Sequence, residues 1–239
     1  MSDFLYKYTS QLNDLILIVC AVIGIIFYKK YKNYNSKIFI YYLIYVAFVD
    51  FIGSYPTYVI EYQQLHGLRD YLKETSFSRN YWWITTFWNL GGVLFMSYYY
   101  YKILLNSNFK KIVKYVCFIF LLSSTTYISQ NLDSFFNSQL KFVNIFGALV
   151  ILNCISLYFI EILNSDKILV FYKSLNSIVS IAMFLWWLII TSLLFYEVYF
   201  SAYDIGYLNL RSNVYLFSNL FMYLTFSLAL IWCDPEQEI

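Results

Sequence analysis

The sequence predicts an all-α, polytopic membrane protein, a bundle of about seven transmembrane helices forming a single domain over residues 1–239. Two observations carry this prediction. Apolar residues make up 61% of the chain and charged residues only 13%, whereas a soluble domain carries about 25% charged residues. The apolar residues also gather in stretches of roughly 20, the length that crosses a hydrocarbon core of about 30 Å.

Seven stretches meet that length criterion. They are residues of about 10–28, 38–60, 82–104, 112–129, 142–162, 175–197 and 213–233. The first is the weakest, because Gln11, Asn13 and Asp14 precede its uniformly apolar part; six helices is the alternative count. Its basic cluster follows the apolar run, the reverse of a secretory signal, so we expect it to remain as a helix.

The positions of Lys and Arg predict the orientation, since cytoplasmic loops retain an excess of these residues. With the N-terminus outside and the C-terminus in the cytoplasm, ten of the 16 basic residues fall on the inner side, in three clusters over residues 29–37, 102–114 and 167–173. The chain is therefore expected to cross a membrane several times, with its basic loops in the cytoplasm. The lipid bilayer is the first expected partner.

One outer loop, residues 62–80, is long enough to hold structure of its own. Leu65, Leu68 and Leu72 recur at helical spacing within it. This pattern predicts a short amphipathic helix on the outer membrane surface.

The second predicted helix carries the most informative side chain, Asp50. A carboxyl group in mid-membrane costs about 2.5–3.5 kcal/mol on insertion scales, so it is a functional candidate by default. Helical spacing places Ser54, Thr57, Tyr58 and Glu61 in a stripe with Asp50 that runs outward. Pro56 in the same stretch predicts a kink.

Other helices offer polar side chains that could line a cavity with this stripe. Helix 82–104 is predicted to present Trp82, Thr85, Thr86, Asn89 and Gly92 on one face. The predicted ligand-binding set is Asp50, Ser54, Tyr58, Asn89, Asn153, Trp186 and Asn219. The alternative interpretation is that these groups only form hydrogen bonds between helices, each worth about 0.6 kcal/mol.

The motifs of several protein classes are missing from the sequence. The only histidine, His66, lies in a polar loop with no second ligand nearby, so we expect no metal site and no cofactor. No Gly-rich phosphate loop, HExxH motif or other catalytic motif occurs, and we expect no enzyme. A net charge of +2 gives no reason to expect nucleic acid as a partner.

The run Phe51-Ile52-Gly53-Ser54-Tyr55-Pro56 follows an aromatic-rich helix, and the chain closes with a helix rich in Leu and Phe. In these features it resembles a group of uncharacterised seven-helix inner-membrane proteins of Bacteroidota. The resemblance implies a compartment and an architecture but no chemistry. Rhodopsins and G-protein-coupled receptors share only the topology, since the last helix has no Lys for a retinal and no Asn-Pro-x-x-Tyr run.

Three functions remain as expectations. The first is a receptor-like or sensory bundle that binds a small ligand from outside and passes a helix shift to a cytoplasmic protein partner. The second is a transporter or ion pathway that uses Asp50. The third is a membrane anchor subunit for a cytoplasmic partner, for which the basic inner loops are the supporting feature.

Overall fold

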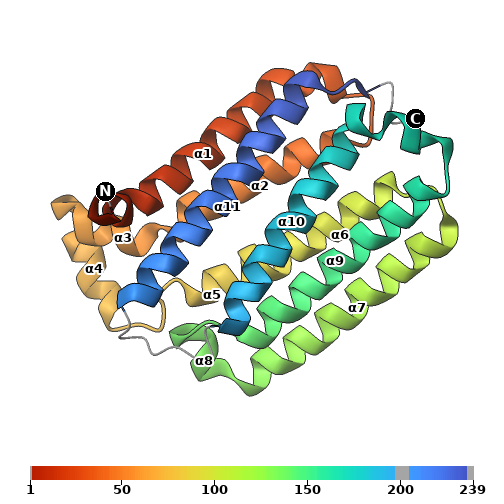
Figure 1. Cartoon of the computed structure of the whole chain (residues 1–239). Helices are drawn as coiled ribbons and strands as arrows, with labels where there is room; N and C mark the ends of the chain where they lie inside the picture. Colours follow the sequence, from red (N-terminus) through yellow and green to blue (C-terminus); the bar gives the residue numbers. More distant parts are fainter. Residues whose placement is uncertain (1, 197–204, 236–239) are drawn as a thin grey trace. The chain divides into compact units, whose positions relative to one another are not determined.

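The computed structural model describes residues 2–196 and 205–235, and every regular element in them is helical (Figure 1). Its α-helices are α1 Ser2–Tyr31, α2 Lys37–Gly53, α3 Tyr55–Glu61, α4 His66–Lys73, α5 Tyr81–Trp83, α6 Gly92–Ile103, α7 Ser107–Gln130, α8 Leu132–Asn137, α9 Lys141–Leu163, α10 Leu175–Tyr196 and α11 Ile205–Trp232. Two 3₁₀ segments, η1 Gln63–Leu65 and η3 Asp166–Lys173, and one π-helical segment, η2 Ile84–Gly91, complete the chain.

All seven apolar stretches predicted from the sequence are helical in the structure. The sixth was predicted to end at Glu197, which lies outside the described residues. Two stretches differ from a regular helix: residues 38–60 are broken into α2 and α3, and residues 82–104 contain the π-helical segment η2. The first helix is longer than predicted, because α1 begins at Ser2 and ends at Tyr31.

Several of these helices are long and apolar enough to cross a membrane. Within the described residues five qualify: Gln11–Tyr31, Ser107–Gln130, Lys141–Leu163, Leu175–Leu193 and Gly206–Trp232. The bent pair Lys37–Gly53 and Tyr55–Glu61, with 41° between its axes, makes a sixth if it forms one span. These helices indicate a membrane protein, as the composition predicts.

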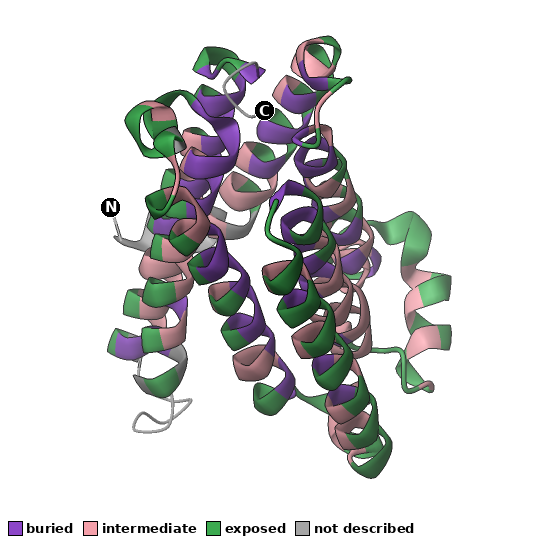
Figure 2. Cartoon of the chain, turned by 90° about the vertical axis from the view of Figure 1, so that its right-hand side faces the viewer, coloured by how far each residue is buried: buried purple, intermediate pink, exposed green. Residues whose placement is uncertain are grey.

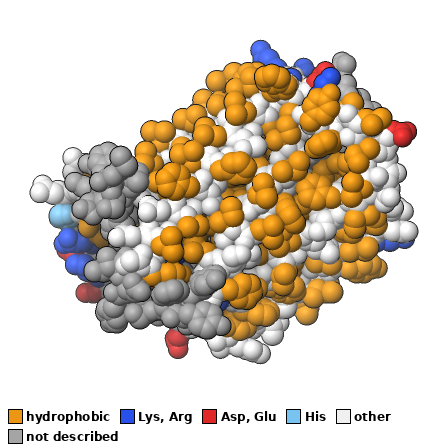
Figure 3. Space-filling view, viewed as in Figure 1, with side chains coloured by type: hydrophobic (Ala, Val, Ile, Leu, Met, Phe, Trp, Pro, Cys, Tyr) orange, Lys and Arg blue, Asp and Glu red, His pale blue; other side chains and the backbone are white. Residues whose placement is uncertain are grey.

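The surface of the helices fits a lipid environment. Each long helix has a buried stripe and an exposed stripe (Figure 2), and the exposed stripes carry large apolar side chains such as Ile26, Phe118 and Leu228. Over α1, α10 and α11, hydrophobic side chains cover most of the visible face, and Lys and Arg gather where α1 and α11 end (Figure 3). In water such a surface would aggregate, whereas lipid tails solvate it.

The chain divides into two compact units, and each is described here by itself. The first unit holds Met1–Ile44 and Ile155–Ile239. Within it α1 and α11 pack in parallel: the Ser212 hydroxyl donates to the Thr9 hydroxyl near their starts, and the Tyr31 hydroxyl lies 3.1 Å from the Leu230 carbonyl oxygen near their ends. Helix α10 packs against α11.

Two basic segments predicted to be cytoplasmic meet the end of α11 at one end of the first unit. The Lys30 ammonium donates to the Ile231 carbonyl oxygen at 3.0 Å, and the Asp234 backbone N–H donates to the Lys173 carbonyl oxygen at 3.1 Å. The end of α1, segment η3 and the end of α11 are therefore neighbours. This is the arrangement expected if all three face the same side of a membrane.

The second unit is Tyr45–Cys154 and includes the rest of α2, the α6 and α7 helices and most of α9. Its core is aromatic and aliphatic, with Met96, Tyr99, Tyr100 and Phe120 fully buried. Gly147 permits close packing there, since a Cβ at this position would lie 2.8 Å from the Val93 Cγ2 atom.

The long loop between α3 and α5 also contains the predicted helix, as α4 His66–Lys73 preceded by η1. Leu65 and Leu68 are exposed on it. The Arg69 guanidinium lies 3.1 Å from the Asp70 carboxylate and lowers the pKa of that carboxyl, with a smaller contribution from Lys73. The contact of this helix with a membrane surface stays a prediction.

Candidate functional site

The candidate site lies in the second unit, where α2 ends and α3 begins. Pro56 has no backbone N–H, so the helix cannot continue its hydrogen bonding through this point. The Thr57 N–H donates to the Ser54 carbonyl oxygen at 3.0 Å, one residue short of the α-helical partner Gly53. The chain thus turns at Ser54, whose hydroxyl donates to the Asp50 backbone carbonyl at 3.1 Å.

Side chains from the following segment bond to the backbone of this break. The Asn80 side-chain amide donates to the Gly53 carbonyl oxygen at 2.8 Å, and the Trp83 indole N–H donates to the Val49 carbonyl oxygen at 2.8 Å. Gly53 favours this approach, since a Cβ on it would lie only 3.0 Å from the Trp83 Cδ1 atom, a tight contact. In the absence of water, such side-chain donors are what make a broken membrane helix tolerable.

The helix facing the break is itself irregular. Residues Ile84–Gly91 form η2, a π-helix of eight residues. Most π-helices are shorter, single-turn bulges within α-helices, and they occur frequently at functional sites. The Tyr45 hydroxyl donates to the Phe87 carbonyl oxygen at 2.7 Å. A Cβ at Gly91 would overlap the same hydroxyl, so Gly91 is required for that contact.

A pocket of about 240 Å³ lies between the break and the π-helical segment. Its lining is Val49, Asp50, Gly53, Ser54, Asn80, Trp83, Ile84 and Trp88. Asp50 is half-buried and is the only ionisable side chain in the lining. One carboxyl group, one hydroxyl and two indole rings therefore surround a space of small-molecule size.

The loop residues beside the pocket are held by an aromatic and hydrogen-bonded cluster. The Tyr55 hydroxyl accepts from the Trp82 indole at 3.2 Å and lies 2.9 Å from the Arg79 carbonyl oxygen. The Phe77 ring packs edge-on against Trp82, with ring centroids 5.1 Å apart. The Arg79 guanidinium donates to the Asn137 carbonyl oxygen at the end of α8. These contacts fix the position of Asn80 and Trp83 in the lining.

Of the predicted ligand-binding residues, the structure brings Asp50 and Ser54 together in this pocket. Tyr58 lies one turn beyond Ser54, half-buried, with its ring 5.7 Å from that of Phe51. The Asn89 side-chain amide donates to the Asn144 side-chain oxygen of α9. Asn89 thus forms a hydrogen bond between helices, as the alternative to a ligand-binding role predicts. Asn153 is exposed on the surface of α9.

The last two predicted residues belong to the first unit. The Trp186 indole donates to the Asn219 side-chain oxygen at 2.7 Å, and the Asn219 amide donates to the Asn13 side-chain oxygen at 3.3 Å. This chain of bonds links α10, α11 and α1.

Sequence reasoning missed Asn80, Trp83 and Trp88. The prediction for helix 82–104 chose the face of Trp82, Thr85 and Asn89, but the pocket is lined from another side of the helix, by Trp83, Ile84 and Trp88. Asn80 precedes the helix and was assigned to the loop. Pro56 could have indicated that a side-chain donor such as Asn80 lies nearby, because a proline in a membrane helix leaves a backbone carbonyl that needs a donor from elsewhere.

Among the described residues, no group of three or more His, Cys, Asp or Glu side chains is arranged to hold a metal ion. No protein-family model, curated protein or solved structure matches the chain. The function must therefore be argued from the pocket and from the topology of the helices.

Proposed function

We propose that this chain is a seven-span, receptor-like protein of the inner membrane, with its N-terminus outside, that binds a small cationic ligand in the Asp50 pocket. The parallel packing of α1 and α11 supports an odd number of spans. If both helices cross the membrane in the same direction, an odd number of crossings separates them, which gives five or seven spans in all.

The contacts of residues 81–103 favour seven over five. This segment is helical throughout its 23 residues, at most about 34 Å at the α-helical rise of 1.5 Å per residue, a length comparable with a hydrocarbon core of about 30 Å. It also runs antiparallel to α2, as the pairs Trp83–Val49 and Phe87–Tyr45 indicate. The bent α2–α3 pair and this segment therefore cross together as a hairpin.

The orientation follows from the basic end of the first unit, which carries Lys30, Lys37 and Lys173 and is assigned to the cytoplasm. Asp50 comes 13 residues after Lys37, the first residue of α2, or about 20 Å along the helix. The pocket then lies in the outer half of the membrane, below the loop that contains α4.

Labelling of single cysteines tests this topology. In a variant without the four native cysteines, a cysteine replacing Glu74 in the outer loop is expected to react with a membrane-impermeant maleimide added to intact cells. A cysteine replacing Asn33 is expected to react only after the membrane is opened. The reverse pattern, or labelling of both sites in intact cells, would contradict the proposed orientation.

The lining of the pocket supports a cationic ligand. An ionised Asp50 carboxylate attracts a cation, and the faces of Trp83 and Trp88 offer cation–π contacts worth about 0.5–2 kcal/mol each. A volume of about 240 Å³ restricts the ligand to a small organic ammonium ion or a hydrated metal cation. With one ionisable group in the lining, binding is better supported than catalysis.

Titration of the purified protein with tetramethylammonium, choline and methylammonium, followed by tryptophan fluorescence, tests the binding proposal. We expect saturable binding of at least one of these ions. Asp50→Asn is expected to weaken it by about 10- to 100-fold, since a charged partner is worth about 1.5–3 kcal/mol. Asp70→Asn, which removes an exposed carboxylate, is the matched control and is expected to leave the affinity unchanged. Equal binding by the Asp50→Asn and parent proteins would refute the assignment.

A second candidate function, an ion pathway through Asp50, has a specific observation in its favour. Transporters place ion sites between discontinuous helices, and here a broken helix faces a π-helical one. The two candidates differ in access, since a pathway opens to both sides of the membrane and a receptor pocket to one. The third candidate, a membrane anchor for a cytoplasmic partner, has no comparable observation behind it.

A further inference from the structure

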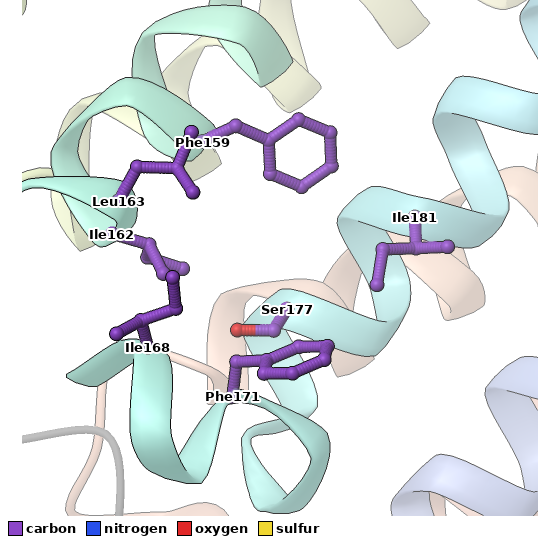
Figure 4. Close-up of a pocket in the computed structure, with 7 residues that line it drawn as sticks. All are labelled: Phe159, Ile162, Leu163, Ile168, Phe171, Ser177 and Ile181. Atoms are coloured by element: carbon purple, nitrogen blue, oxygen red, sulfur yellow. The ribbon is translucent and has the colours of Figure 1, made fainter.

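A second pocket, of about 320 Å³, lies in the first unit at the junction of α9, η3 and α10 (Figure 4). Phe159 and Leu163 reach it from the last turns of α9, Phe171 from η3, and Ile181 from α10. Its one polar side chain, Ser177, is hydrogen-bonded to the buried Tyr158 hydroxyl at 3.1 Å. The pocket thus offers an incoming molecule an almost entirely apolar wall.

The pocket is open to the surroundings of the helices. Leu163 is 65% exposed, Phe171 41% and Ile181 37%, although all three line it. The pocket also lies beside the ends of two candidate spans, since one span ends at Leu163 and the next begins at Leu175. An apolar pocket open at the edge of the hydrocarbon region is accessible to lipid tails.

Segment η3, which forms one side of the pocket, has the composition of a membrane interface. Leu169 is 75% exposed and Tyr172 is 56% exposed, and an aqueous loop would not present such side chains to water. Lys173 ends the segment, exposed, with its ammonium 5.7 Å from the Tyr172 ring centroid. In sequence this cation stands between two lining residues, Phe171 and Ser177.

We propose that this pocket binds one acyl chain of an anionic phospholipid, whose headgroup phosphate is held by Lys173. The apolar lining takes the chain by van der Waals contact, because a tail that leaves the bilayer for this wall stays in apolar surroundings. The proposed orientation places this lipid in the inner leaflet, but binding itself does not depend on the Asp50 pocket.

Photo-crosslinking tests this proposal. The full-length protein is placed in nanodiscs with a trace of phosphatidylglycerol that carries a diazirine in its acyl chain, and the adducts are mapped by mass spectrometry. We expect the lining residues to be labelled several-fold more, per residue, than the lipid-exposed helix α7. Phosphatidylcholine with the same chain should label the parent protein about fivefold less than phosphatidylglycerol does. The Lys173→Gln variant should show a similar loss with phosphatidylglycerol, since one basic residue contributes about 1 kcal/mol to the binding of anionic lipid.

Two variants show whether the label reports the pocket. Ile181→Trp fills the pocket with a larger side chain and is expected to lower the yield of adducts several-fold. Leu163→Trp is expected to have the same effect, so the test still stands if one of the two variants folds poorly. Ile160→Trp is the matched control, because Ile160 has a similar exposure of 44% and is not in the lining. Unchanged labelling in both filling variants would overturn the acyl-chain site, and equal labelling by the two lipids would overturn the role of Lys173.

Discussion

Trp83→Ala is expected to destabilise the protein by about 2–3 kcal/mol. The indole N–H is bonded to the Val49 carbonyl oxygen, and its ring packs 4.2 Å from that of Phe87 and directly against Gly53. Burial of a large aromatic ring is worth about 3–5 kcal/mol in Trp→Ala substitutions. Because Trp83 is only half-buried, we expect a loss of stability at or below the lower end of that range.

Reversible unfolding in mixed micelles measures this loss. Trp83→Phe keeps the ring and removes the N–H, so a loss of about 1 kcal/mol is expected. Trp232→Ala is the control, since Trp232 is 83% exposed, and its effect should stay within about 0.5 kcal/mol. If Trp83→Ala unfolds like this control, Trp83 does not stabilise the broken helix and our account of the pocket wall is wrong.

The helices could be predicted because the requirement for them is local. Any segment that crosses lipid must satisfy its backbone internally, so length and hydrophobicity alone locate it. The helical spacing of Leu65, Leu68 and Leu72 located the segment that contains η1 and α4, and Pro56 located the break between α2 and α3. The number of spans and their direction depend on the whole chain and remain proposals, supported by the parallel pairing of α1 and α11.

The pocket could be predicted only in part. Asp50 and Ser54 were found because the sequence predicts both on one helix, and the Ser54 N–H still donates to the Asp50 carbonyl oxygen as in an α-helix. Trp83 and Trp88 were missed because they lie on another side of their helix than the face chosen for its polar residues, and the sequence does not say which side of that helix faces the break. The exposure of Asn153 shows another limit, since the sequence does not say which side of a uniformly apolar helix faces its neighbours.

The pairing of Asn89 with Asn144 illustrates a third limit. A polar residue in an apolar helix indicates that a partner is needed, but both a ligand and a second amide satisfy that need. The structure supplies the amide. Asp50 differs from Asn89 because it lines a cavity as well as a helix interface, and this is why the functional proposal depends on Asp50.

The central claim is that the Asp50 carboxylate is ionised and lies in a pocket open to the outside. Ser54 lines the same pocket one helical turn away, and side chains four residues apart on a helix lie about 5–6 Å from one another. The reactivity of a cysteine at position 54 therefore reports both the access of a reagent to the pocket and the charge of the Asp50 carboxyl group. A unit charge about 6 Å away contributes about 0.7 kcal/mol in water and more in a less polar medium.

The measurement compares the rates at which a cationic and an anionic methanethiosulfonate, both added from outside, modify Ser54→Cys in a variant without native cysteines. We predict modification from outside, with the cationic reagent favoured by about tenfold or more at neutral pH, because the two reagents feel the charge with opposite sign. Adding Asp50→Asn should abolish this preference, whereas adding Asp70→Asn should leave it unchanged. No modification from outside, or the same preference with and without the Asp50 carboxylate, would contradict the account.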